Sequence, residues 1–268
     1  MRKSSFVYCG DDAAAWLEPR VRKEFPGNSL CVPRMNMVVH RCHMPQVTGC
    51  QAVVELLLDA GKAGDVNCVD RYGGTPLPYA VRTGCDAVVK LLLATGKVDM
   101  NHRNEYDQTL LYAAENTHQT IVKLLLDTRK VDVNCKDTYN YTPLVYAAQR
   151  GHGKVVKLLL DTDKVDVDFK NNYSRTPLSY ATINGHEAVV KLLLDTGKVD
   201  VNCKNNYSLT PLSYAVRNRH ETIVKLLLDT GEVDVACRDT NEGQTAVSFA
   251  TRNGHEAVAK RLQQAKSS

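Results

Sequence analysis

Apolar residues recur along this chain in short blocks that are separated by polar turns. The runs VVELLLD, VVKLLLA, IVKLLLD, VVKLLLD, VVKLLLD and IVKLLLD lie in this order between Val53 and Asp229. A second, shorter apolar block begins at a threonine once in every 33 to 35 residues, and these threonines are residues 75, 109, 142, 176, 210 and 245. A fixed period of this size is typical of a chain that is built of stacked repeats.

The repeat at 171–204 shows what one period encodes. Thr176 is a good N-cap, and the proline after it fits the first turn of a helix, so PLSYATIN is predicted to form a short first helix. Gly185 can adopt the left-handed conformation that ends this helix, and Glu187 begins a second helix in which AVVKLLL forms a broad apolar face. VDVNCKNNYS is left as an extended turn, or finger. Because two short helices cannot bury such a face alone, neighbouring repeats must stack on it.

The array is expected to occupy 47–268, with a partial first repeat, about five full repeats and a polar C-terminal cap. Residues 1–46 carry no repeat signal, and Pro45 stands where other repeats have a helical alanine. We expect this segment either to fold back as an improvised cap or to mark the chain as a piece of a longer array. The polar cap is indicated by Arg261, Gln263 and Gln264, where other repeats have leucine and aspartate.

Composition and charge leave most classes of partner open. The chain has 268 residues, of which 43% are hydrophobic and 24% charged, and its formal net charge of +4 is too small to indicate nucleic acid or membrane by itself. The N-terminus, MRKSSFVYCGDDAAAW, has no apolar run behind its basic residues, so it is not a secretory signal, and no run is long enough to span a bilayer. The sequence predicts a monomer that is cytoplasmic or nuclear and is not secreted.

Searches for catalytic and metal-binding motifs give no site. The histidines at 186, 220 and 255 begin HExxH-like segments, but the fifth residue is never histidine, so they are interpreted as connector residues. No phosphate-binding G-x-x-x-x-G-K-[ST] loop and no G-x-S-x-G elbow is present. The irregular N-terminal segment has potential zinc ligands, but their spacing contains no CxxC pair, and unpaired thiols are favoured; these residues are Cys9, Cys31, Cys42, Cys50, His40 and His43. The sequence therefore predicts no enzyme activity, cofactor or metal.

Several repeats resemble the ankyrin pattern D-x-x-G-x-T-P-L-H-x-A-A-x-x-G-H-x-x-[IV]-V-x-x-L-L. The segments that carry the resemblance include DRYGGTPLPYAVRTGCDAVVKLLLATGKVDMN at 70–101 and DTYNYTPLVYAAQRGHGKVVKLLLDTDKVDVD at 137–168, which ends in Asp168 instead of asparagine. The wording of these repeats is similar to that of ankyrin arrays in filamentous fungi. The resemblance implies an all-α repeat solenoid of helix–turn–helix units with β-hairpin or finger loops, which binds a protein partner on a concave side formed by fingers and first helices.

Two departures from the pattern concern the connector between the two helices of a repeat. Thr117 and Arg219 replace the glycine that other repeats have there. A residue other than glycine is strained at positive φ, so we expect these two repeats to be the least stable of the array.

Binding specificity is expected at exposed positions that the fold does not require. One such position, at the fingertip, is a tyrosine in five repeats: Tyr72, Tyr106, Tyr139, Tyr173 and Tyr207. Tyrosine suits protein interfaces, but packing of each ring against the neighbouring finger explains the pattern equally well, and both interpretations stay open. Core packing is favoured for a second aromatic set, in the first helices: Tyr79, Tyr112, Tyr146, Tyr180, Tyr214 and Phe249.

Basic residues form a second periodic set near the fingers. Arg103, Lys136, Lys170, Lys204 and Arg238 precede the fingers, Arg150 and Arg217 end first helices, and Arg175 lies in a finger. The alternative is that these are ordinary solvated side chains. The hypothesis is an acidic protein segment that is attracted by charge and held by tyrosine, with binding that weakens as salt rises. Two other hypotheses remain: nucleic-acid binding by the basic face, or a regulatory fragment of a larger enzyme.

Overall fold

The computed structural model describes residues 65–69, 73–102, 108–240 and 243–267, and the side chains of 266 and 267 are not described. The chain divides into two compact units, Met1–Thr109 and Leu110–Ser268, which are treated separately below. The predictions for the N-terminal segment, for Pro45 and for the first partial repeat lie outside the described residues. So do the N-terminal cysteines and histidines that were considered as zinc ligands.

Pairs of helices alternate with fingers along the described residues of both units. The described part of the first unit contains α4 (Pro76–Arg82) and α5 (Asp86–Ala94), which pack against each other. The second unit contains five further helix pairs, and α6 begins at the boundary residue. These helices are α6 (Thr109–Glu115), α7 (Gln119–Asp127), α8 (Pro143–Arg150), α9 (Gly153–Leu160), α10 (Pro177–Ile183), α11 (Glu187–Leu194), α12 (Pro211–Arg217), α13 (Glu221–Leu228), α14 (Ala246–Arg252) and α15 (Glu256–Ser267).

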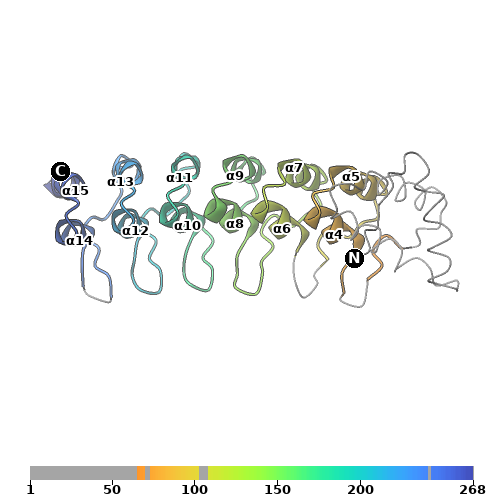
Figure 1. Cartoon of the computed structure of the whole chain (residues 1–268), viewed down its shortest axis with the longest axis horizontal. Coiled ribbons are helices and arrows are strands. Elements are labelled where there is room, and N and C mark those ends of the chain that lie inside the picture. The colour runs from red at the N-terminus through yellow and green to blue at the C-terminus, as the bar shows by residue number, and fades with distance from the viewer. Residues whose placement is uncertain (1–64, 70–72, 103–107, 241–242, 268) are drawn as a thin grey trace, which may run out of the picture. The chain divides into compact units, whose positions relative to one another are not determined.

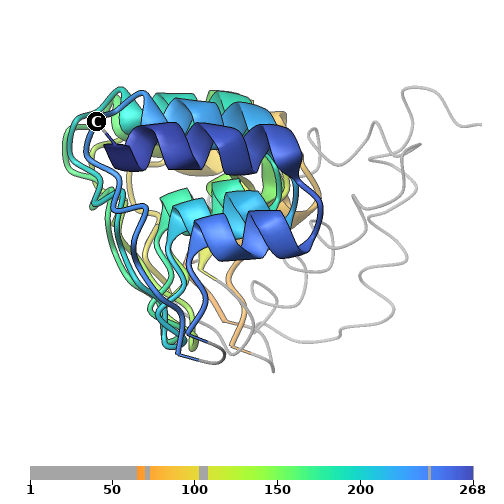
Figure 2. The same ribbon diagram turned by 90° about the vertical axis from the view of Figure 1, so that its left-hand side faces the viewer.

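Within the second unit the helices form two layers. The first helices of the repeats lie in one layer, and these are α6, α8, α10, α12 and α14 (Figures 1 and 2). The second helices lie in the other layer, and these are α7, α9, α11, α13 and α15. The fingers extend from the side of the first helices. Within the described residues the fingers form no β-strand, and an isolated antiparallel bridge pairs Arg238 with Thr245. The prediction of an all-helical repeat fold with finger loops is confirmed.

The threonine caps of α8, α10, α12 and α14 follow the sequence prediction, whereas Thr75 at the start of α4 makes no side-chain cap hydrogen bond. The side-chain oxygens of Thr142, Thr176 and Thr210 each accept a hydrogen bond from the backbone N–H three residues later, at 3.3, 3.3 and 3.2 Å, and proline follows each threonine. This contact satisfies one of the donors that a helix N-terminus leaves without an intrahelical partner. Thr245 makes the same contact at 3.2 Å in the last helix pair, where alanine replaces the proline.

The leucine runs form the core. Leu125, Leu159, Leu193 and Leu227, one from each of α7, α9, α11 and α13, are completely buried. In α15 the equivalent layer is completed by Leu262, which is also completely buried, whereas Arg261, Gln263 and Gln264 are exposed. The second helices therefore contribute their apolar face to the stack, and the last helix exposes polar side chains on its outside.

Histidines of the connectors tie each repeat to the one before it. The Nε2 atoms of His152, His186 and His220 lie 2.9, 3.0 and 3.3 Å from the carbonyl oxygens of Glu115, Gln149 and Ile183, respectively. These contacts cross from one helix pair to the next and satisfy carbonyl groups near the end of a first helix. The interpretation of these histidines as structural connector residues is confirmed for His186 and His220.

Candidate functional site

An Asp or Asn at the base of three successive fingers determines their shape. The Oδ1 atom of Asp137 accepts hydrogen bonds from the backbone N–H groups two and four residues later, at 2.9 and 2.7 Å. Asn171 Oδ1 does the same at 3.0 and 3.1 Å, and Asn205 Oδ1 at 2.8 and 2.9 Å. Each finger is thus closed around one side-chain oxygen, which is the usual role of Asp and Asn in turns.

The same Asp or Asn also joins the finger to the first helix of its repeat. Tyr146 donates its hydroxyl to Asp137 Oδ2 at 2.8 Å, whereas Asn171 Nδ2 donates to the hydroxyl oxygen of Tyr180 at 2.8 Å. Asn205 Nδ2 makes the equivalent bond to Tyr214. Tyr180 and Tyr214 are buried, so these rings are part of the scaffold, as predicted for this aromatic set. Sequence reasoning missed the partner residue, although an Asp or Asn two positions before each fingertip tyrosine was visible.

Neighbouring fingers are linked through their backbones. The N–H groups of Asn172, Asn206 and Thr240 donate to the carbonyl oxygens of Tyr139, Tyr173 and Tyr207 at 3.2, 3.4 and 3.1 Å, respectively. Asn140 Nδ2 also donates to Asn172 Oδ1, and Ser174 Oγ donates to Asn206 Oδ1, both at 2.6 Å. Each fingertip is therefore fixed relative to the next one, and the row of fingers has a regular spacing.

The fingertip tyrosines of the second unit are exposed. Tyr139, Tyr173 and Tyr207, here called the fingertip row, retain 57%, 46% and 54% of their accessible surface. Apart from Val69, they are the only large hydrophobic residues among the described ones that are exposed to this degree. Such exposure favours the interpretation as a contact surface over packing of each ring against the next finger. Tyr72 and Tyr106 lie outside the described residues.

The basic residues that precede the fingers differ in what they contact. Lys170 and Lys204 are exposed, and each lies three positions before a tyrosine of the fingertip row. Lys136 occupies the equivalent position but is half-buried, with its Nζ atom 3.8 Å from the centre of the Phe169 ring. Arg238 is exposed and donates from Nη1 to the carbonyl oxygen of Gly243 at 2.9 Å. Arg103 lies outside the described residues.

The two arginines at the ends of first helices are engaged in ion pairs. Arg150 Nη2 lies 2.6 Å from Glu115 Oε1, and Arg217 Nη2 lies 2.8 Å from Asp239 Oδ2, whose side chain is only 3% exposed. Both pairs cross from one repeat to a neighbouring one. The positive charge near the fingers is therefore smaller than a count of basic residues indicates.

Arg175 lies among the aromatic rings of the scaffold. Its guanidinium carbon is 5.9, 5.7 and 5.5 Å from the ring centres of Tyr173, Tyr180 and Tyr214, and its Nε atom donates to the Tyr214 hydroxyl at 3.2 Å. Distances of this size are those of cation–π contacts. Next to it, burial and the hydrogen bond with the Tyr180 hydroxyl raise the pKa of Tyr141 above its usual range. Arg175 thus links a fingertip ring to the buried tyrosines of two repeats.

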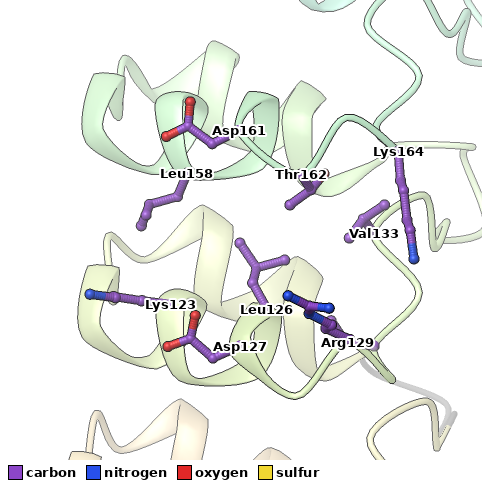
Figure 3. A pocket seen from close by; sticks show the side chains of 10 residues that line it. Lys123, Leu126, Asp127, Arg129, Val133, Leu158, Asp161, Thr162 and Lys164 are labelled. Atoms are coloured by element: carbon purple, nitrogen blue, oxygen red, sulfur yellow. The ribbon is translucent and has the colours of Figure 1, made fainter.

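A depression opens on the opposite layer, between the second helices α7 and α9 (Figure 3). Its volume is about 630 Å³, and Leu126, Leu158 and Val133 supply its apolar lining. Positively and negatively charged side chains surround it, among them Lys123 and Asp161. None of the predicted site residues lies in this depression, and its mixed charge indicates no particular ligand.

The described residues contain no cluster of three or more His, Cys, Asp or Glu side chains that is placed to bind a metal ion. The Sγ atoms of Cys203 and Cys237 lie 3.9 Å from the carbonyl oxygens of Ser174 and Ser208. Among the same described residues, no helix has both the length and the apolar character needed to cross a membrane.

Comparison with family models identifies repeats over most of the chain. A model of three ankyrin-repeat copies matches residues 110–205 and 196–267, and a model of one ankyrin repeat matches residues 72–105. These ranges include nearly all of the helix pairs from α4–α5 to α14–α15. Comparison with curated proteins gives no match.

Proposed function

Because the chain belongs to the ankyrin-repeat family, whose repeats generally mediate protein–protein interactions, we propose that it is a non-catalytic module that binds an acidic protein segment on its finger side. The observation that carries this proposal is the fingertip row, which exposes three tyrosine rings on fingers held by inter-finger hydrogen bonds. A finger backbone that is already fixed loses little freedom on binding, so the fingertips suit recognition of a partner.

Charge supports an acidic partner. Lys170 and Lys204 are exposed and stand three residues before tyrosines of the fingertip row, whereas Arg150 and Arg217 already have carboxylate partners. The proposed contact set is therefore centred on Tyr139, Tyr173, Tyr207, Lys170 and Lys204. Carboxylates of a partner would be attracted by these lysines, and the association rate would fall as ionic strength rises.

The test is affinity capture with the full chain. Wild type is compared with a variant in which Tyr139, Tyr173, Lys170 and Lys204 are all changed to alanine, and captured proteins are identified by mass spectrometry. A control variant carries Lys157→Ala and Lys191→Ala, two exposed lysines of the second helices, and so removes the same amount of charge from the other layer. We expect the finger variant alone to lose a protein partner, and we expect capture to weaken between about 0.1 and 0.5 M salt.

Two outcomes would contradict the proposal. If wild type and the finger variant capture the same proteins, the finger side is excluded as the binding surface. Nucleic acid that co-purifies with wild type and is lost with the finger variant would favour the basic face as a nucleic-acid site, with a salt dependence that reports the number of phosphate contacts.

A further inference from the structure

The spacing of the fingertip row limits which backbone conformations a partner can use along it. The row has one exposed ring per repeat, and the backbone hydrogen bonds from Asn172 to Tyr139 and from Asn206 to Tyr173 hold successive fingers in register. Packed helices lie about 8–10 Å apart, so the fingertip positions that carry the rings recur at about this distance along the stack. A partner that contacts all three rings in the same way must repeat its own structure at this distance.

Polyproline II is the extended conformation that meets this requirement. It has three residues per turn and a rise of about 3.1 Å, so every third side chain returns to the same edge after about 9 Å. A β-strand returns to the same face after two residues, at about 6.7 Å, and after four residues at about 13 Å, and neither value matches. An α-helix returns after seven residues, at about 10.5 Å, but it presents a cylinder 10–12 Å wide to a row of single rings.

The chemistry of the row agrees with this conformation. Proline-rich segments bind to aromatic surfaces because their conformation is fixed before binding and little entropy is lost. The charges have the same period as the rings, since Lys170 precedes Tyr173 by three residues and Lys204 precedes Tyr207 by three residues, and both lysines are exposed. A partner that supplies an apolar contact to each ring can therefore supply a carboxylate once per turn as well.

We propose that the fingertip row binds an acidic polyproline II segment in which proline and a carboxylate side chain recur every third residue. This inference rests on the proposed function, because it identifies the partner of the same surface. It also explains why the exposed rings are tyrosines, which offer a flat apolar surface to proline and a hydroxyl to the partner's backbone carbonyl groups.

The test measures the affinity of two synthetic peptides for the full chain by fluorescence anisotropy. The first peptide repeats Pro-Pro-Glu, and the second has the same composition but has its glutamates collected in one block, so that it keeps the conformation and charge but loses the period. We expect the periodic peptide to bind at least about tenfold more tightly. The double variant Tyr173→Ala/Tyr207→Ala should reduce this affinity about tenfold, whereas Lys157→Ala/Lys191→Ala should leave it unchanged.

Circular dichroism of the Tyr173→Ala/Tyr207→Ala variant checks that the exposed substitutions leave the fold intact. Equal affinity of the two peptides, or no measurable binding of either, overturns the proposal, as does tighter binding of an acidic α-helical peptide with a seven-residue period. The capture experiment separates these failures from failure of the proposed function. If the finger variant loses its partner while the peptides do not differ, the function stands and the polyproline II partner is wrong.

Discussion

Asp168 is a residue whose neighbours favour a different side chain. At the equivalent positions, Asn134 Nδ2 donates to the carbonyl oxygen of Lys164 at 2.9 Å and Asn202 Nδ2 donates to that of Glu232 at 2.8 Å. An ionised aspartate has no proton to donate, and the Oδ1 atom of Asp168 is buried without a hydrogen-bond partner. Burial, together with the nearby charges of Asp200 and Asp166, raises the pKa of Asp168 to about 6, against the opposing effect of Lys170 and a backbone hydrogen bond.

This raised pKa predicts that Asp168→Asn stabilises the protein at neutral pH. The folded state favours the protonated carboxyl, so this group contributes stability that is fully present below its unfolded pKa of about 4 and is lost as pH rises through about 6. We expect the substitution to raise the free energy of unfolding by about 1–2 kcal/mol at pH 7.5, after allowance for solvent screening. The gain should shrink toward zero as pH falls to about 4, as measured by urea unfolding.

The reciprocal substitution is the matched control. Asn134→Asp places a carboxylate at a position where the amide now donates to Lys164 and accepts from the backbone N–H of Asp166 at 2.9 Å. It should destabilise the protein by a similar amount at pH 7.5 and introduce the same pH dependence. Equal stability of wild type and Asp168→Asn at neutral pH would show that Asp168 is accommodated in its ionised form.

At the scale of the elements, the connector between the two helices of a repeat is one place where repeats differ in local strain, beside other positive-φ residues such as Asp163 and Ser174. Gly151 and Gly185 both have φ of 74°, and Thr117 and Arg219 adopt the same left-handed region with φ of 63° and 60°. Thr117 has a compensating contact, since its Oγ1 atom lies 2.9 Å from His152 Nε2, whose N–H it shares with the Glu115 carbonyl oxygen. The sequence predicted positive φ at both sites but did not predict this difference between them.

These connectors give a second stability prediction. Arg219→Gly should raise the free energy of unfolding by about 1 kcal/mol, because it removes the left-handed strain of a residue with a Cβ atom. Thr117→Gly should change it little, since the relief of strain is offset by loss of a hydrogen bond worth about 1 kcal/mol. Chemical unfolding of both variants measures the difference, and an equal gain from the two would contradict the assigned role of the Thr117–His152 contact.

Gly185→Ala is a control in which a side chain is added at a left-handed connector residue and also collides with a neighbouring histidine. Its Cβ atom would have to occupy a position 2.7 Å from Cε1 of His220, at a φ of 74°. We therefore expect Gly185→Ala to lower the free energy of unfolding by at least about 2 kcal/mol. This residue shows why a connector glycine serves two purposes, because the histidine of the next repeat occupies the space beside it.

At the scale of the whole molecule, the repeat period made the fold predictable, while contacts between repeats did not follow from it. The helix pairs, the threonine caps and the buried leucines are local or periodic features, so one repeat was enough to predict them. Arg150, Arg217 and Arg175 each contact a residue of another repeat. Their partners are Glu115, Asp239 and Tyr214, respectively. These contacts depend on how repeats stack side by side, and a sequence pattern within one repeat carries no information about them.

Stacking also predicts how the second compact unit opens. Each repeat is stabilised mainly by its neighbours, so local unfolding begins where a repeat is weakest and spreads to the repeats beside it. The strained connector at Arg219 lies between α12 and α13, so in the described residues α13 and the pair α14–α15 follow it. We therefore expect α12 to α15 to open together and their amides to exchange with solvent faster than those of α8 to α11, whose connectors contain Gly151 and Gly185.

Native-state hydrogen exchange measured by mass spectrometry tests this order of opening. Arg219→Gly should slow amide exchange in α12 to α15 by about fivefold, which corresponds to about 1 kcal/mol, and should leave exchange in α8 to α11 nearly unchanged. Lys225→Ala, an exposed substitution on α13, serves as the control and should not slow exchange in either region. Uniform protection along all helix pairs, in wild type and in Arg219→Gly, would mean that the repeats unfold as one cooperative block and that connector strain does not determine where the stack opens.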